Sequence, residues 1–89
     1  MNVEFDKSFL KSLDNIKDSK ILHKVETVIL KCETVNSLFE IQNVKKLSGF
    51  SNYFRIKISD YRIGFEFLNK NTIRFIIVTH RKDIYKKFP

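Results

Sequence analysis

Hydrophobic residues recur at helical spacing in the first third of the chain. One apolar stripe runs through residues 9–16 behind Asp6, which we expect to be its N-cap. A second stripe runs through residues 21–32 and fits the i, i+3, i+4, i+7 template, with Ser19 as its expected N-cap. Because the connection between the stripes is short, the pattern predicts an antiparallel helical hairpin.

Apolar and polar residues alternate in other parts of the chain, which is typical of strands with one buried face. Residues 53–59 and 61–68 alternate most clearly, and residues 2–5 show the same pattern over a shorter run. A hairpin-turn signal at residues 69–71 precedes an almost continuously apolar run at residues 73–78. Such a run predicts a central strand that is covered on both faces.

These elements predict an α+β fold in the order β-α-α-β-β-β. An N-terminal strand and the helical hairpin are expected to pack on an antiparallel-dominated sheet of about four strands. Residues 44–47 carry a further signal for a short strand, and the polar tail predicts one helical turn with Ile84 and Phe88 as apolar anchors. The length of 89 residues favours a single domain over residues 1–89.

The formal charge is +7, from 17 Lys and Arg against 10 Asp and Glu. A cationic surface releases counterions when it meets a polyanion, so nucleic acid is a candidate partner. Charge leaves open an acidic protein partner and an ordinary solvated surface. The single Cys32 lies on an apolar helix face, which favours a buried hydrophobe over a nucleophile. The chain lacks a signal-peptide pattern and a long apolar run, so we expect a cytoplasmic protein without a membrane span.

Three cations are expected at one edge of the sheet. Arg55 and Lys57 lie two apart on one strand and therefore share a face, and Arg62 begins the next strand as their cross-strand neighbour. Like charges this close destabilise the fold unless an anion offsets them. The spacing predicts a phosphate-binding face, and it leaves open an ordinary solvated sheet face.

A second group of candidate residues follows the last strand. His80 can move a proton near neutral pH, Arg81 can hold phosphate, and Tyr85 can stack on a base. The structural alternatives are a hydrogen-bonded histidine and a tyrosine that packs on the sheet edge. Further lysines are expected to add to the positive field, namely Lys45, Lys46, Lys82, Lys86 and Lys87.

Other chemistries fit the residues poorly. The chain has no Cys pair or His cluster for zinc, no Gly-rich phosphate loop and no paired carboxylates for a two-metal nuclease. We therefore expect no metal and no cofactor. The remaining inventory of cations, imidazole and aromatic rings is that of a metal-free RNA-cleaving site.

Four segments together resemble the RelE/ParE superfamily of bacterial type II toxins. They are Lys46–Gly49, Tyr53–Ile58, Tyr61–Ile63 and Thr79–Tyr85, and the helical hairpin before them matches as well. The resemblance covers essentially the whole chain and implies one RelE-like toxin domain. It also implies a compact fold with two helices packed on an antiparallel-dominated sheet.

Within this superfamily the RelE branch cleaves mRNA in the ribosomal A site without a metal. The resemblance implies that Lys57 is the general base, that Arg62 holds the phosphate and that Arg81 assists the leaving group. It implies that Tyr85 stacks on or orients the nucleotide, and that Arg55 stands where other members carry a transition-state lysine. Attack by a ribose 2′-OH then leaves a 2′,3′-cyclic phosphate.

Some members use a nearby histidine as the acid, so the resemblance leaves the role of general acid open between His80 and Arg81. It further implies mRNA on the ribosome with 16S rRNA contacts, and a toxin–antitoxin hetero-oligomer with an acidic cognate antitoxin. The tail that contains Ile84 and Phe88 is a candidate for docking or displacement. The alternatives are a ParE-like inhibitor of DNA gyrase without nuclease activity and an inactive relative that only binds antitoxin.

Overall fold

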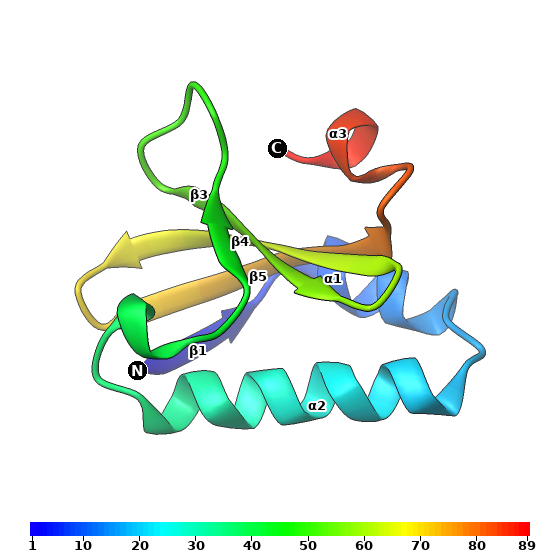
Figure 1. The fold of residues 1–89 in the computed structure, drawn as a ribbon, viewed down its shortest axis with the longest axis horizontal. Helices are drawn as coiled ribbons and strands as arrows, with labels where there is room; N and C mark the ends of the chain where they lie inside the picture. The colour runs from blue at the N-terminus through cyan, green and yellow to red at the C-terminus, as the bar shows by residue number, and fades with distance from the viewer.

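Five strands and three α-helices make up the fold, in a computed structural model that describes residues 1–89 (Figure 1). In chain order they are β1 (Asn2–Phe5), α1 (Lys7–Asp14), α2 (Ser19–Thr34), the 3-10 helix η1 (Leu38–Glu40), β2 (Val44–Lys46), β3 (Tyr53–Ile58), β4 (Tyr61–Asn69), β5 (Thr72–His80) and α3 (Ile84–Lys87). The predicted α+β class, the N-terminal strand and the helical turn in the tail are confirmed.

The five strands form one mixed sheet in the order β1-β5-β4-β3-β2. β1 runs parallel to β5, and the other three pairs are antiparallel, so the predicted antiparallel-dominated sheet is confirmed. The strand count of about four was one too low. The additional strand is β2, which has only three residues and pairs at the edge with β3. Its signal is weak because three residues hardly show an alternation.

Side-chain caps fix where the two long helices begin. Asp6 caps α1, as predicted, and its carboxylate accepts a hydrogen bond from the Ser8 N–H at 3.2 Å. For α2 the prediction was wrong by one residue: Asp18 is the cap, its carboxylate accepts from the Lys20 N–H at 2.9 Å, and Ser19 is the first helical residue. Both caps satisfy an N–H that has no partner inside its helix.

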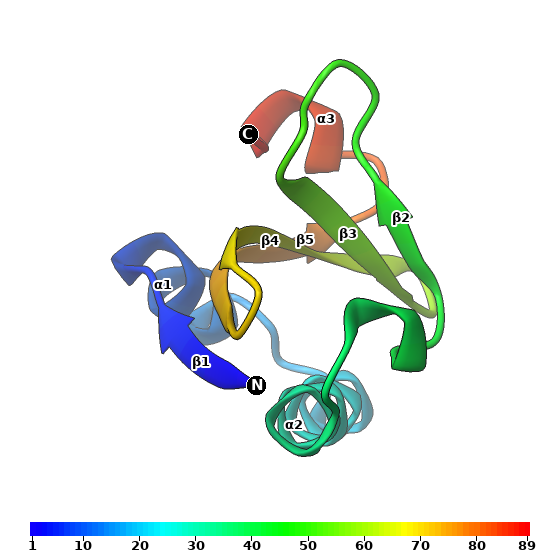
Figure 2. The same cartoon turned by 90° about the vertical axis from the view of Figure 1, so that its left-hand side faces the viewer.

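The hydrophobic core lies between one face of the sheet and helices α1 and α2 (Figure 2). α1 packs mainly against β5, and α2 packs against β1 and β3. Phe9 from α1 and Val25 from α2 are buried among strand residues such as Phe65 and Phe75. The predicted coverage of this face by the helices is confirmed. α3 lies over the other face, where it closes a second, smaller apolar cluster.

A β-bulge in β5 changes which residues face the core. Gly64 of β4 pairs with Ile77, but the next residue, Phe65, pairs with Phe75, so Ile76 is an extra residue in the ladder. Ile77 therefore joins the second cluster on the far face, and Val78 joins the main core. Because of the bulge, the residues that follow Val78 face the opposite side of the sheet from the one that an unbroken two-residue alternation would give them.

None of the helices is long and apolar enough to cross a membrane. The described residues also contain no group of three or more His, Cys, Asp or Glu side chains that could hold a metal ion.

Burial of Cys32 predicts a change of stability at high pH. Desolvation raises the pKa of this thiol to about 11, from an ordinary value of 9.0. Between these values the folded protein keeps a proton that the unfolded chain loses, so the free energy of unfolding falls as pH rises, by roughly 2 to 3 kcal/mol in total. Cys32→Ala removes this dependence. Urea unfolding from about pH 8 to about pH 11 should therefore show the stability gap between wild type and Cys32→Ala becoming smaller. A gap of constant size contradicts a buried neutral thiol.

Candidate functional site

Three predicted site cations meet across two paired strands. Lys57 on β3 is directly opposite Arg62 on β4, so the two side chains share one face of the sheet. Arg55 is opposite Gly64 on one side and opposite Lys45 of β2 on the other. The prediction that Arg62 is a cross-strand neighbour of Lys57 is therefore confirmed. This cluster, Lys45 with Arg55, Lys57 and Arg62, is called the cationic cluster below.

The cationic cluster surrounds an open hollow of about 360 Å³. Its lining residues are Asn43, Val44, Lys45, Arg55, Lys57 and Arg62, and no carboxylate is among them. Lys57 is exposed, and Arg55 and Arg62 are half-buried. The single ion pair of the protein joins Arg74 to Glu4 elsewhere, so no acidic side chain forms an ion pair with the cluster. Such a hollow is suited to a phosphate group.

Arg62 is held in place by the turn between β3 and β4. Its Nη1 donates to the carbonyl oxygens of Ser59, at 2.9 Å, and of Tyr61, at 2.8 Å. These two bonds fix the guanidinium at the rim of the hollow. The other N–H groups of the guanidinium donate to no protein acceptor, which leaves its planar fork available for a bidentate contact with phosphate.

The C-terminal tail brings Tyr85 to the cationic cluster. The Cζ atom of Arg55 lies 5.2 Å from the centroid of the Tyr85 ring, which is the geometry of a cation–π contact. The Tyr85 side chain is 67% exposed, so the ring remains open to a stacking partner. The contact between Arg55 and Tyr85 could not be predicted from sequence, because it depends on how the tail docks on the sheet.

Two buried anchors, Ile84 and Phe88, hold the tail on the sheet. They form the second cluster with Leu47 and Ile77. The Phe88 ring lies so close to Gly64 that a Cβ atom added there would be 2.7 Å from the ring. The predicted docking of the tail through these two anchors is therefore confirmed, and any side chain at position 64 would have to displace the Phe88 ring.

His80 lies on the opposite face from Lys57 and Arg62. It pairs in register with Tyr61, next to Ile58, and Ile58 belongs to the main core under the helices. Its ring meets the Tyr61 ring edge-to-face at 5.6 Å, and its Nδ1 accepts a hydrogen bond from the Lys82 N–H at 3.2 Å. From the sequence, His80 was expected beside the cations, because His80 and the cations lie near the same end of the sheet. The structure separates them, since residues opposite each other in a ladder share a face.

Arg81 lies at the end of the sheet where Lys57 and Arg62 are found. Its N–H donates to the carbonyl oxygen of Asp60 at 2.7 Å, which ties residue 81 to the turn between β3 and β4. The side chain is exposed. Lys82 is exposed as well and follows in the loop, outside the lining of the hollow.

The side chains of Lys45 and Lys46 lie on opposite faces of the sheet, because they are neighbours in strand β2. Lys45 lines the cationic hollow, whereas Lys46 pairs with Phe54 and lines a different, largely apolar groove. From the sequence, both lysines were expected to add to one positive electrostatic field. Sequence reasoning also missed Asn43, which lines the hollow and has a φ of 63°. The signal available for Asn43 was its residue type, since asparagine tolerates the left-handed region better than most residues.

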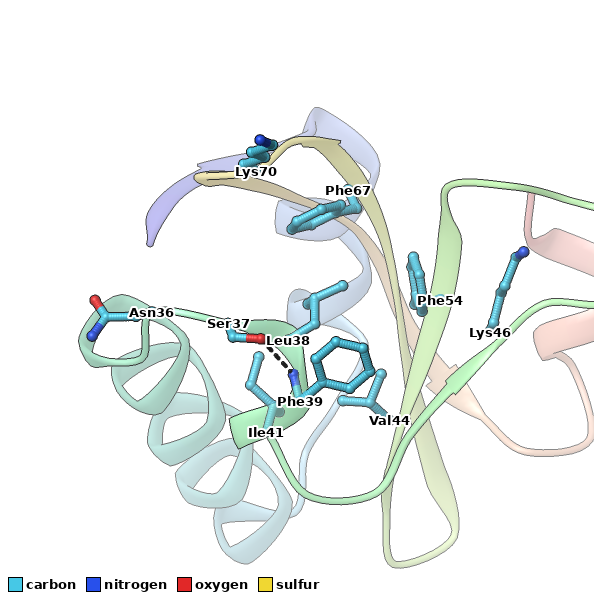
Figure 3. A pocket seen from close by; sticks show the side chains of 10 residues that line it. All are labelled: Asn36, Ser37, Leu38, Phe39, Ile41, Val44, Lys46, Phe54, Phe67 and Lys70. Atoms are coloured by element: carbon cyan, nitrogen blue, oxygen red, sulfur yellow. Dashed lines mark hydrogen bonds between the residues drawn. The ribbon is translucent and has the colours of Figure 1, made fainter.

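The apolar groove is the largest cavity, at about 640 Å³ (Figure 3). Figure 3 shows Leu38 and Phe39 of η1 on one side of it, and Phe54 and Phe67 of the sheet on the other. Phe39 is 99% exposed. The adjacent apolar residues Leu38 and Phe39 were the signal in the sequence for this groove. None of the cationic cluster lines it.

Comparisons with known proteins give one consistent result. Residues 3–85 match the family described as the ParE toxin of the type II toxin-antitoxin system, parDE. The chain is 41% identical to Toxin RelE3 of Methanocaldococcus jannaschii over the whole of both proteins. Its structure is similar to the RelB-RelE antitoxin-toxin complex from Methanococcus jannaschii, with a TM-score of 0.81 and 40% identity over 97% of this chain and 99% of the other. The fold also matches the RelBE2 toxin-antitoxin complex from Mycobacterium tuberculosis, with a TM-score of 0.69 and 18% identity over 90% of this chain and 96% of the other.

The contact between Gly64 and Phe88 predicts a specific stability defect. In Gly64→Ala the new methyl group displaces the Phe88 ring, and we expect a loss of roughly 1 to 3 kcal/mol in the free energy of unfolding. In a Phe88→Ala background the same change meets an empty space and should cost much less. Urea unfolding of the four proteins measures both costs. Equal costs in the two backgrounds show that the tail does not dock on Gly64.

Proposed function

We propose a reaction for this chain on the premise that it belongs to the ParE toxin family, within the RelE/ParE superfamily. It is a toxin of a type II toxin–antitoxin system. The proposed reaction is metal-independent endonucleolytic cleavage of mRNA in the ribosomal A site, which inhibits translation and growth. The observation that carries this proposal is the cationic hollow, which has four cations, no carboxylate and an exposed tyrosine beside it.

The proposed mechanism gives roles to residues of the cationic cluster and to Tyr85, which lies beside Arg55. Lys57 is the general base and takes the proton from a ribose 2′-OH. The freed 2′-oxygen attacks the adjacent phosphorus in line, and the bond to the 5′-oxygen of the next nucleotide breaks. Arg55 and Arg62 stabilise the charge that develops on the phosphate oxygens. Tyr85, open to solvent beside Arg55, stacks on a base and orients the strand.

The general acid in this proposal is Arg81. Of the two residues that the sequence left open for this role, only Arg81 is tied by its backbone to the turn beside Arg62. His80 lies on the helix-covered face with Tyr61, and the sheet separates it from Lys57. The arginine stabilises the departing 5′-oxygen by donating a hydrogen bond or a proton, and the product is a 2′,3′-cyclic phosphate.

We further propose that the partners are mRNA on the ribosome, with contacts to 16S rRNA, and a cognate antitoxin. The related toxins of Methanococcus and Mycobacterium were solved as RelB-RelE and RelBE2 complexes. The net charge of +7 is complementary to an acidic antitoxin. The toxin domain extends over residues 1–89 and would bind this antitoxin as a hetero-oligomer.

Cleavage of a programmed ribosome tests the proposed reaction. Primer extension on an mRNA that is bound to purified ribosomes should show cuts in the A-site codon when the protein is added, and Lys57→Ala should reduce the rate at least about 100-fold, because it removes the general base. Lys11→Ala is a matched control, since this exposed lysine lies on α1. It should cut like wild type.

Three outcomes separate the alternatives. Loss of cleavage in Lys57→Ala, with a native circular dichroism spectrum, supports the reaction. Intact mRNA with folded wild-type protein contradicts it, and a gyrase cleavage-complex assay then tests the ParE-like alternative, which the name of the matched family favours. Absence of both activities leaves an inactive relative that only binds antitoxin.

A second prediction separates Arg81 from His80. Arg81→Ala should slow cleavage by about 100-fold, because the leaving oxygen loses its donor. His80→Ala should cut at the wild-type rate, since its ring packs on Tyr61 across the sheet from the hollow. Single-turnover cleavage on the ribosome measures both. Slow cleavage in a stable His80→Ala protein contradicts the assignment of Arg81.

A further inference from the structure

A second hollow of about 310 Å³ adjoins the cationic one. It lies between α2 and the sheet, and its lining residues are Lys24, Thr27, Val28, Asn43, Lys57, Ile58 and Ser59. Asn43 and Lys57 line both hollows, so the two are neighbours that meet at these residues. No carboxylate lines the second hollow either. Neither lining therefore repels a polyanion strand that follows both hollows.

Lys24 is fixed across this second hollow. Its Nζ donates to the Oγ of Ser59 at 2.6 Å, a contact that joins α2 to the turn between β3 and β4. A hydroxyl is a neutral partner, so the positive charge of Lys24 is not compensated, and the protein has no other ion pair than Arg74 with Glu4. The lysine is thus held in place with two further N–H donors available, which is the arrangement that an anion needs.

Two unusual backbone conformations flank Lys57. Asn43 has a φ of 63° and Ser59 has a φ of 52°, and they are the only non-glycine residues in the left-handed region. The carbonyl oxygen of Asn43 accepts a hydrogen bond from the Lys57 N–H at 3.1 Å. Unfavourable conformations of this kind persist where the surroundings enforce them, and they are frequent at binding sites. Here both of them shape the boundary between the two hollows.

We propose that the second hollow is a subsite for a backbone phosphate adjacent to the scissile one in the same RNA strand. Lys24 is its principal cation, Ser59 provides a hydroxyl group, and Lys57 lies between the two phosphates. The inference rests on the proposed function, because it assumes that the first hollow binds the scissile phosphate. It adds a residue of α2 to the substrate contacts, and it gives the strand a direction across the end of the sheet.

Short RNA probes with one neutral linkage test the subsite. The parent probe is a tetranucleotide with a 2′-deoxy group at the attacking position, which prevents cleavage. Two further probes replace the phosphate on the 5′ or on the 3′ side of the central one by an uncharged methylphosphonate. Binding to wild type, Lys24→Ala and Lys24→Arg is followed by NMR titration at low salt. Lys31→Ala, two turns further along α2, is the matched control.

We expect one of the two neutral probes to bind wild type roughly threefold more weakly than the parent, which is the effect of one exposed charge pair. In Lys24→Ala this difference should vanish, while Lys24→Arg and Lys31→Ala should keep it. The slope of log K against log salt for the parent should fall by about 0.7 in Lys24→Ala, as for one lost phosphate contact.

Two results overturn the subsite. One is equal binding of all three probes to wild type, and the other is an unchanged difference between the probes in Lys24→Ala. Either result leaves the proposed reaction intact provided that Lys57→Ala weakens the binding of the parent. If wild type and Lys57→Ala bind the parent probe equally well, the first hollow is not a phosphate site. The proposed reaction and the subsite are then both contradicted.

Discussion

The two-residue period of β4 is the constraint on which the site depends. Ile63 and Phe65 face the helices and are fully buried, while Arg62 and Gly64 face the other side. A slip of one residue against β3 would expose both apolar side chains and bury the arginine. Burial of each large apolar side chain stabilises the fold by about 1.5 to 3 kcal/mol, so the core alone determines the register. The same register places Arg62 opposite Lys57.

The site is built at some cost to stability. Four cations surround one hollow without a carboxylate, and two non-glycine residues beside it have left-handed backbones. Mutual repulsion and strain of this kind lower the free energy of unfolding, and burial elsewhere must compensate for it. A polyanionic ligand removes the repulsion. This is the physical reason to regard the cluster as a binding site, since an ordinary solvated surface intersperses charges of both signs.

Much of the site was predictable from sequence because alternation is strict where β3 and β4 pair. Arg55, Lys57 and Arg62 were placed on one face from spacing alone, and the structure agrees. His80 was not predictable in the same way. The bulge at Ile76 changes the parity of β5, and a bulge inside an apolar run leaves no trace in the pattern of polar residues.

The other features that sequence analysis misplaced or did not single out likewise depend on the three-dimensional arrangement of the elements. Lys46 points away from Lys45 because β2 is a strand, but three residues at a sheet edge are too few to show it. The second hollow depends on how α2 approaches the β3–β4 turn, and that approach is set by packing of the whole core. Lys24 is one of several exposed lysines in the sequence, and only the contact with Ser59 distinguishes it.

The C-terminal tail links the stability of the fold to the geometry of the site. Ile84 and Phe88 are buried on the face of the sheet away from α1 and α2. Tyr85 lies between them in the chain and contacts Arg55. A tail with only two anchors is among the segments that open most easily, since few apolar contacts hold it. Displacement of the tail would remove Tyr85 from Arg55 and uncover Gly64 and Leu47 together. The position of the stacking ring therefore depends on the docking of Phe88, and a change at Gly64 acts on that ring through the tail.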